Sequence, residues 1–379
     1  MQSSPNLIPT GKTETGRETF VLNLGPQHPA THGVLRVKLE MDGEYVMRAE
    51  PVCGYIHRMH EKMGENRTYA QFLPNPSRID YLSAMHYCQA YVGCVERAAG
   101  IEVPPRAEYI RVITSELNRI SSHLVWFGAF LLDLGGFTPL LYAFDDREKI
   151  LDLLEGITGA RLTYCYYRFG GLCNDVDDEF LSGTREFVKY MRPRLKMYRS
   201  LVTDNIILRK RLEGIGPISA DMCRKYGATG PVIRGSNVPN DVRKVEPYSV
   251  YPELDFDIPH YPECDCMARY NVRMEEMEQS LRIVEQAVAK LPDGPHINPK
   301  VPKAVKPPAG DYYFAVEAAR GRFSVRIVSD GKDTPYRMKL RTPSFGNLSL
   351  FGEACEGMLL PDALALMGSL DLVIPDIDR

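Results

Sequence analysis

Apolar and polar positions alternate near the start of the chain in a pattern typical of β-strands. Two runs, Phe20–Leu24 and Val34–Leu39, carry the β-branched residues and the alternation of half-buried strands. Asp42-Gly43 is a strong signal for a hairpin turn a few residues later. We therefore predict a small antiparallel sheet over residues 19–52, preceded by a flexible N-terminus over residues 1–18.

The centre of the chain has the spacing of amphipathic helices. Apolar residues recur at this spacing over 78–99 and again over 104–134, and glycines at positions 100 and 135 stop the two runs. Further helices are predicted over 140–157, 177–201 and 268–291. Strand-like alternation returns over 312–316, 322–328 and 336–341.

These elements predict an α+β chain dominated by helices, with short antiparallel sheets near its two ends. We expect one domain over residues 19–379, and we find no internal repeat. Its predicted parts are an N-terminal sheet (19–52), a helical core (78–291), a Pro/Lys-rich exposed connector (292–310), and C-terminal strands with a tail (311–379).

Composition narrows the class of protein. The chain has 46 Lys and Arg against 49 Asp and Glu, so neither a nucleic-acid footprint nor an acidic tail stands out. The most apolar run, Leu124–Leu134, is too short for a membrane span and contains Asp133. Nine scattered cysteines are typical of a reducing compartment. We therefore expect a chain of cytoplasmic type that does not cross a membrane.

An irregular loop with two histidines, Gly25-Pro26-Gln27-His28-Pro29-Ala30-Thr31-His32-Gly33, joins the first two predicted strands. Its two prolines fix φ and hold the preceding residues extended, so both imidazoles are carried on a stiff backbone. Histidine titrates near neutral pH, which favours a role in proton chemistry. The alternative, two turn histidines that face solvent, stays open at this point.

Asp133 interrupts the most apolar segment close to a predicted helix C-terminus, where the helix dipole disfavours a negative charge. Such a carboxylate is either partly neutralised or paired with a cation, or it is a surface aspartate at a fraying end. Glu116, Arg119 and His123 share one face of the same helix. We interpret these three residues as a solvated charged stripe.

The segment Cys53-Gly54-Tyr55-Ile56-His57-Arg58-Met59-His60 has a density of Cys and His that suggests a metal site. However, the chain has no Cys-x-x-Cys, and Cys264-Asp265-Cys266 is its one close pair of cysteines. We therefore expect no metal site held by this chain alone. The glycine motifs that bind dinucleotides or phosphates, and the Gly-x-Ser-x-Gly of hydrolases, are absent as well.

Five groups of short sequence blocks, taken together, indicate a protein family. They are Gly25–Gly33, Gly54–Arg58 with Glu61-Lys62, Arg78–Tyr81, Leu131–Gly135, and Gly368–Asp371 with Asp378-Arg379. In this order the chain, from Phe20 to Arg379, closely resembles the 49-kDa subunit family of respiratory complex I, the NADH:quinone oxidoreductase. The resemblance implies a fold like the large subunit of nickel–iron hydrogenases, with a quinone pocket where the hydrogenase has its metal site.

The hydrogenase activity itself is excluded by the cysteines. The pattern Cys-Gly-x-Cys-x-x-x-His would fall on residues 53–60, where Ile56 replaces the second Cys. The pattern Asp-Pro-Cys-x-x-Cys would fall near residues 371–376, which contain no Cys. Four thiolates cannot be assembled, so this chain cannot hold a nickel–iron centre.

The resemblance assigns roles to five residues. His32 and Tyr81 match the residues that hold the quinone carbonyls, and Asp133 matches the carboxylate that pairs with that histidine. Arg58 and Arg78 match arginines close to an iron–sulfur cluster whose ligands belong to a neighbouring subunit. The implied chemistry is reduction of a quinone by two electrons and two protons, with the tyrosine and the histidine each donating a hydrogen bond and then a proton.

The implied partners are other complex I subunits, notably the cluster-bearing subunit at the quinone site and the membrane-arm subunits. NADH would be bound elsewhere, and this chain would be inactive alone and peripheral on the cytoplasmic side of the membrane. Two alternatives stay open, an equivalent subunit of a complex with ferredoxin or another donor, and a structural scaffold. Retention of the five ionisable residues together argues against a scaffold.

Two features depart from the family pattern. Thr163 stands where many relatives have a histidine that is linked to protonation at the cluster. The connector is also shorter than in most relatives. The first departure bears on redox-linked protonation, and the second on a peripheral subunit contact.

Overall fold

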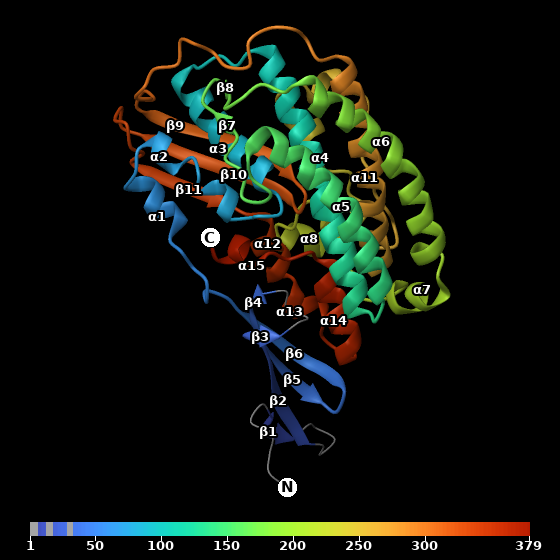
Figure 1. Ribbon diagram of the computed structural model, residues 1–379. Coiled ribbons are helices and arrows are strands. Elements are labelled where there is room, and N and C mark those ends of the chain that lie inside the picture. Colours follow the sequence, from blue (N-terminus) through green and yellow to red (C-terminus); the bar gives the residue numbers. More distant parts are fainter. Residues whose placement is uncertain (1–6, 13–17, 29–32) are drawn as a thin grey trace.

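The N-terminal sheet projects from a helical body (Figure 1). In the computed structural model, which describes residues 7–12, 18–28 and 33–379, this sheet has four antiparallel strands in the order β1-β2-β5-β6. They are β1 (Leu7–Lys12), β2 (Glu18–Leu24), β5 (Arg36–Asp42) and β6 (Tyr45–Val52). The predicted strands and the turn at Gly43 are confirmed. Strand β1 shows that the prediction of a flexible segment was wrong for Leu7–Lys12.

The two-histidine loop lies at the hairpin tip between β2 and β5. Within it, β3 (Gln27–His28) pairs with β4 (Gly33–Val34) in a two-stranded ladder. Residues 29–32 lie outside the described residues, and His32 is among them. The predicted role of His32 therefore stays a prediction.

Long helices form the body, as the apolar spacing predicted. They are α3 (Ala84–Ala99), α4 (Pro105–Asp133), α5 (Phe137–Thr158), α6 (Asp178–Tyr198) and α11 (Cys266–Ala289). Helix α4 is buried along most of its length between α5 and α11, which makes it the centre of the core. None of the helices in the described ranges is long and apolar enough to span a membrane.

The start of the first long helix differs from the prediction. A helix from Arg78 was expected, but α3 begins at Ala84, after a 3-10 turn at Pro76–Arg78 and an irregular turn over 79–83. The carboxylate of buried Asp80 accepts the backbone N–H groups of Leu82 and Ser83, at 3.0 and 3.2 Å. This local bonding satisfies the backbone of the turn and keeps it out of the helix.

A second antiparallel sheet has the order β11-β10-β9, and α3 packs on it (Figure 1). Its strands are β9 (Gly310–Ala318), β10 (Gly321–Ser329) and β11 (Arg337–Arg341), close to the predicted ranges. The chain then continues through α12 (Pro343–Ser349), α13 (Phe351–Ala354), α14 (Leu360–Ser369) and α15 (Ile374–Asp378). The C-terminus thereby returns to the junction between the body and the N-terminal sheet.

Several short elements were not predicted, because runs of two to seven residues give little periodicity. They are α1 (His60–Glu65), α2 (Tyr69–Phe72), β7 (Tyr167–Arg168), β8 (Gly171–Leu172), α7 (Ile206–Leu212), α8 (Ala220–Tyr226), α9 (Pro231–Arg234) and α10 (Val242–Val245). The connector over 292–309 has no helix in the structure and is mostly exposed.

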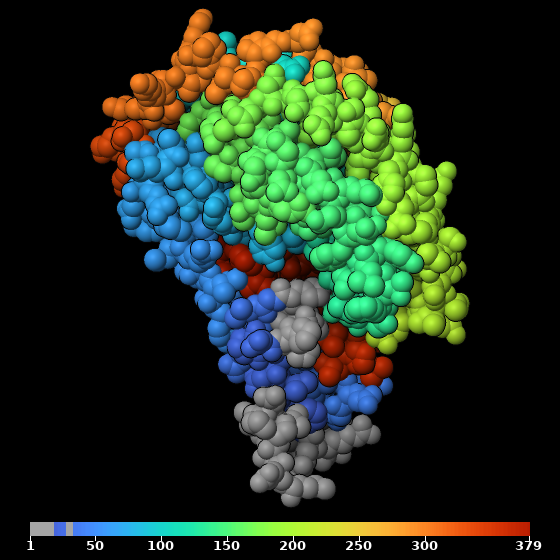
Figure 2. All heavy atoms as spheres, viewed as in Figure 1, coloured from blue at the N-terminus to red at the C-terminus, as the bar shows by residue number. Residues whose placement is uncertain are grey.

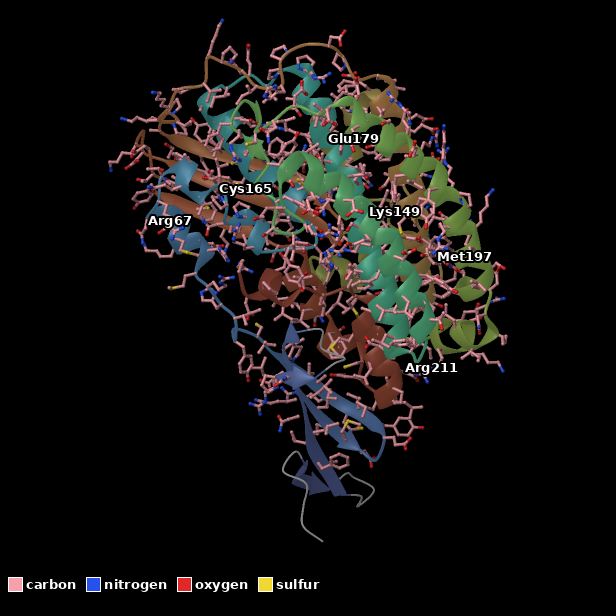
Figure 3. All side chains as sticks on the ribbon, in the orientation of Figure 1. Arg67, Lys149, Cys165, Glu179, Met197 and Arg211 are labelled. Carbon is pink, nitrogen blue, oxygen red and sulfur yellow. The ribbon has the colours of Figure 1, made fainter. Side chains whose placement is uncertain are left out.

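The interior contains a network of charged side chains that the sequence did not predict. Glu116, Arg119 and His123 are fully buried, so their interpretation as a solvated stripe was wrong. They lie in the core because α4 is covered along most of its length. Side chains on α10 and α11 pair with Glu116 and His123, and a backbone carbonyl on β9 accepts a hydrogen bond from Arg119. Other charged side chains, such as those of Arg67, Lys149 and Glu179, lie on the outside of the body (Figure 3).

Candidate functional site

The C-terminal segment, residues 368–379, is the place where the predicted site residues approach one another. Its atoms, red in Figure 2, lie in a recess between the helical body and the N-terminal sheet. The segment contacts the end of α4, β4 at the end of the two-histidine loop, and the loop that carries Arg58, and Arg320 links it to the turn that carries Tyr81. Each of these contacts has its own chemistry.

Tyr81 lies in the turn before α3, half-buried. Burial raises the pKa of its phenol; Arg320 opposes this shift, whereas Asp80 and Asp371 add to it. The hydroxyl therefore keeps its proton at neutral pH and is available as a hydrogen-bond donor.

Arg320 locks this turn to the C-terminal segment. Its Nη1 donates to Asp80 Oδ2 at 2.9 Å and to the hydroxyls of Ser83 and Ser122 at 3.3 and 3.1 Å. Its Nη2 donates to Asp371 Oδ1 at 3.1 Å. All three members of the Asp80–Arg320–Asp371 triad are buried, so this pairing satisfies charges that could not otherwise stay in the core.

Asp133 is the last residue of α4, so it lies at a helix end as predicted, and its side chain is exposed. A Cβ built on Gly368 would lie 3.7 Å from Asp133 Oδ2 and only 2.7 Å from Phe130 Cδ2. Trp126 Nε1 also donates to the carbonyl of Gly368, at 2.9 Å. The glycine thus lets the end of α14 approach the end of α4, which brings Asp133 to the segment that contains Asp371.

Gly33 places the end of the two-histidine loop against the same segment. A Cβ at this position would lie 2.6 Å from Ile374 Cγ1, so only glycine fits. Its φ of 152° is also one that other residues rarely adopt. Gly33, which follows His32 in the chain, therefore packs against Ile374, three positions after Asp371.

Asp378 binds the loop that carries Arg58. Its carboxylate accepts the backbone N–H groups of Gly54 and Ile56, at 2.7 and 2.9 Å. Its carbonyl oxygen lies 2.6 Å from His57 Nδ1. A cavity of about 350 Å³ borders this contact, lined among others by Cys53, His57 and Arg379.

Arg58 and Arg78 flank a buried histidine, His60. Burial first, and then the charges of Arg58, His57 and Arg78, lower the pKa of His60 to about 4. Arg78 donates to the carbonyl of Pro74 and to the hydroxyl of Ser77. Across the described parts of the chain, no ion pair involves Arg58 or Arg78. Their positive charges are therefore not neutralised by any carboxylate among the described residues.

The residues that position this site were not predicted from the sequence. Asp80 and Asp371 stood in blocks that carried the resemblance, but Arg320 stood in none of them. A second buried pair was missed too, in which the Tyr87 hydroxyl donates to Asp376, an aspartate that also accepts the N–H of Ser344 at 3.0 Å. Burial, and then the charge of Asp80, raise the pKa of Asp376 to about 7. Only the fold reveals these contacts, because the bonds from Arg320 to Asp80 and from Tyr87 to Asp376 join residues more than 200 positions apart.

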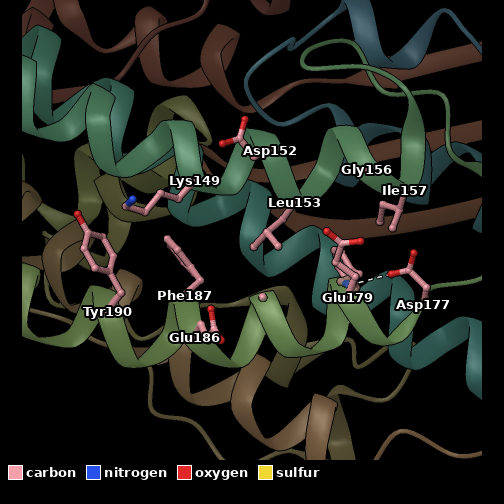
Figure 4. Close-up of a pocket in the computed structure, with 12 residues that line it drawn as sticks. Lys149, Asp152, Leu153, Gly156, Ile157, Asp177, Glu179, Glu186, Phe187 and Tyr190 are labelled. Carbon is pink, nitrogen blue, oxygen red and sulfur yellow. Dashed lines mark hydrogen bonds between the residues drawn. The ribbon is translucent and has the colours of Figure 1, made fainter.

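A groove between α5 and α6 contains none of the predicted site residues. It has a volume of about 530 Å³ (Figure 4), with an apolar floor and acidic residues such as Glu179 and Glu186 along its rim. In the described residues there is no cluster of three or more His, Cys, Asp or Glu side chains that could hold a metal ion. The recess at the C-terminal segment therefore remains the candidate site.

Comparison with known proteins gives one family. The sequence model described as respiratory-chain NADH dehydrogenase, 49 Kd subunit, matches residues 133–307 and 299–379. An NADH-quinone oxidoreductase subunit of Opitutus terrae is 78% identical over 362 residues, which cover 96% of this chain and 91% of the relative. The corresponding NADH-quinone oxidoreductase subunit of Desulfotalea psychrophila is 73% identical over 96% of this chain and 97% of its own. The chain belongs to the family of the 49-kDa subunit of the respiratory NADH:quinone oxidoreductase.

Proposed function

We propose that the recess at the C-terminal segment binds the headgroup of a quinone, and that Tyr81 and His32 supply its hydrogen bonds and protons. The observation that carries this proposal is the rigid placement of Tyr81. Its turn is fixed by the buried Asp80–Arg320–Asp371 triad, and its hydroxyl keeps its proton near neutral pH. A proton donor held in place before the reaction needs no reorganisation as negative charge develops on a quinone oxygen.

The proton chemistry follows from the groups that this chain supplies. A phenol is a weak acid in water, with a pKa of about 10, but a reduced quinone is a strong base and can take its proton. His32 would hold the second carbonyl and supply the second proton. The electrons would come from the iron–sulfur cluster of the neighbouring subunit, one at a time.

Arg58 and Arg78 support an approach of that cluster. Both lack a carboxylate partner among the described residues, so their charges act on whatever lies outside. Positive charge near an iron–sulfur cluster raises its reduction potential and favours electron arrival there. The two arginines would thus face the cluster-bearing partner, on the cytoplasmic side of the membrane.

Contacts with further subunits are supported by the surface around Asp133. Apolar side chains remain exposed beside this end of α4, among them those of Leu132, Phe137 and Leu141. Exposed apolar groups that gather in this way favour a protein contact. We assign this surface to a membrane-arm subunit of the complex.

The contact between the Cys53 loop and Asp378 supports the proposed likeness to the hydrogenase large subunit. The segment 53–60, which would carry metal ligands in that enzyme, is bonded through the backbone of Gly54 and Ile56 to Asp378, two residues after the second such segment. In this chain the same junction keeps Cys53 but lacks the other three cysteines of the hydrogenase patterns. The quinone recess would therefore stand where the ancestral metal site was.

Asp133 connects the site to proton translocation in this proposal. Loss of a proton from His32 would free or reorient Asp133, and this change of charge would be the first step of coupling to the membrane proton pumps. An Asp133→Asn variant is expected to lower the number of protons pumped per electron. Pumping at the full ratio in that variant would rule out this step.

The main test is Tyr81→Phe, measured as quinone-dependent electron transfer in membranes. We expect a loss of about 10- to 100-fold while the iron–sulfur clusters are still reduced by NADH, which places the block at the quinone. Tyr336→Phe is the matched control, because Tyr336 is 72% exposed and takes no part in the triad. An unchanged rate in Tyr81→Phe would show that the hydroxyl has no part in the reaction.

A further inference from the structure

The β7–β8 hairpin has a cysteine at each of its two ends. Cys165 lies two positions before β7, and Cys173 directly follows β8. The N–H of Cys173 donates to the carbonyl of Tyr166 at 2.9 Å, which extends the pairing of the two strands by one position. The two cysteines therefore lie at the open end of one hairpin; Cys165 is labelled in Figure 3.

One guanidinium contacts both sulfurs. Arg168 Nη1 lies 3.5 Å from Cys165 Sγ, and its Nη2 lies 3.6 Å from Cys173 Sγ. Nη1 also donates to the carbonyls of Cys165 and Tyr167, at 2.7 and 3.0 Å, which fixes the orientation of the group. Arg168 takes part in no ion pair with any carboxylate of the described chain. The sulfurs are thus its two side-chain acceptors.

The two thiols differ in access. Cys173 is exposed and Cys165 is half-buried, whereas five of the other cysteines are buried. In thiol–disulfide exchange the thiolate is the nucleophile, and a neighbouring arginine stabilises it. An exposed thiol, a second thiol beside it and a shared cation are the parts that such an exchange requires.

We propose that Cys165 and Cys173 form a thiol–disulfide exchange site that reacts with low-molecular-weight disulfides, with Arg168 holding both sulfurs. The thiolate of Cys173 attacks one sulfur of the small disulfide, which releases one thiol and leaves a mixed disulfide. Cys165 Sγ then attacks Cys173 Sγ and releases the second thiol. The two protein thiols are oxidised to one disulfide, the small disulfide is reduced to two thiols, and the two protons go to these products.

The test uses the reduced full-length chain and oxidised glutathione as the probe, at pH 7 with an acid quench. Trypsin cleaves after Arg161, Arg168 and Arg185, so each cysteine lies in its own peptide, 162–168 or 169–185. Mass spectrometry should detect these two peptides joined by a disulfide. We expect this product to form about 10-fold faster than the glutathione adduct of Cys53, another exposed cysteine.

Variants separate the steps. Cys165→Ser should stop at the mixed disulfide, so that a glutathione adduct accumulates on Cys173. Arg168→Met should slow the linked product about 10-fold, while Cys53→Ser should leave it unchanged. Separate adducts on both cysteines without linkage would overturn the proposal, as would linkage no faster than the reaction of Cys53.

Folding is checked by circular dichroism in each variant. If Arg168→Met does not fold, Cys165→Ser is compared with Cys173→Ser. Cys165→Ser must keep a glutathione adduct in peptide 169–185, and Cys173→Ser must lose the fast reaction with glutathione. Equal reactivity of these two variants would also overturn the proposal. Since no quinone takes part, the result is independent of the proposed quinone site.

Discussion

Two groups of charged residues in this chain differ in how they are paired. The interior network joins α4, α9, α10, α11 and β9, and each of its members is at most 1% exposed: Glu116, Arg119, Arg234, Asp241, Arg243, Glu276 and Glu317. At the recess, Arg58 and Arg78 have no carboxylate partner in the described chain, and Asp133 and Tyr81 reach the surface. Residue type is thus a poor guide to function, whereas pairing and exposure distinguish the two groups.

The charged groups of the interior network are paired because an unpaired charge in a core is costly. Arg243 Nη1 lies 3.1 Å from Glu116 Oε1, and Arg234 Nη1 lies 2.7 Å from Glu317 Oε1. His123 Nε2 lies 2.9 Å from Glu276 Oε2. These charges hold distant segments together, and none of them is available to a partner or substrate.

The largest expected effect tests the structural side of this comparison. Glu116→Gln leaves Arg119 and Arg243 without their shared carboxylate, and we expect the free energy of unfolding to fall by about 3–5 kcal/mol. Urea unfolding of the full chain measures it. Glu186→Gln, at an exposed glutamate on α6, is the control and should change stability by less than about 0.5 kcal/mol. Equal stability of the two variants would contradict a structural role for the network.

The sequence predicted the long elements well, because Pro, Gly and regular apolar spacing are local signals. Helix α4 begins at Pro105 and ends at Asp133, within one residue of the predicted range. The start of α3 was missed. The apolar spacing of a helix continues back to Arg78, but the side chain of Asp80 accepts backbone N–H groups of the turn and keeps it from being helical. Asp80 is also bonded to Arg320, and local propensity carries no information about a contact between residues so far apart in the chain.

The site was predicted in its residues but not in its support. Tyr81, Asp133, Arg58 and Arg78 came from the resemblance, and their surroundings came only from the structure. The stripe on α4 was interpreted as solvated because Glu, Arg and His are rarely buried. Only partners far along the chain, such as Arg243 and Glu276, make that burial possible.

The next prediction concerns the Asp80–Arg320–Asp371 triad. Its charges are buried and paired like those of the interior network, but it lies next to the recess. Asp80→Asn should release Arg320 and loosen the turn of Tyr81, so that quinone-dependent electron transfer falls about 10-fold with the complex assembled. Arg320→Lys should show a smaller loss, because one ammonium cannot reproduce the fork that reaches both aspartates. A rise in KM for quinone larger than the fall in kcat would identify a positioning role.

Arg322→Lys is the matched control for the triad, since Arg322 lies in β10, two residues after Arg320, and pairs with Glu246 outside the recess. It should leave electron transfer unchanged. If Asp80→Asn has normal kinetics, the triad only stabilises the fold.

A smaller effect is expected on the unpaired cations. Arg58→Gln and Arg78→Gln should each lower the reduction potential of the partner's iron–sulfur cluster by tens of millivolts, without loss of folding stability. A redox titration followed by electron paramagnetic resonance measures the potential. Arg224→Gln, an exposed arginine paired with Asp221, is the control. A potential that stays the same in both variants would mean that the two arginines do not face the cluster.

The last prediction concerns the pH dependence that His60 adds to stability. Its pKa in the folded chain is about 4, below the ordinary 6.5, so the unfolded chain binds more protons between these values. Stability should therefore fall as the pH falls from about 6.5 to about 4, and His60→Gln should remove this part of the dependence. His260→Gln, at an exposed histidine, is the control. Because Arg58 and Arg78 contribute to the low pKa, replacing either with Gln should raise it, and an unchanged pKa would show that their charges do not reach the buried ring.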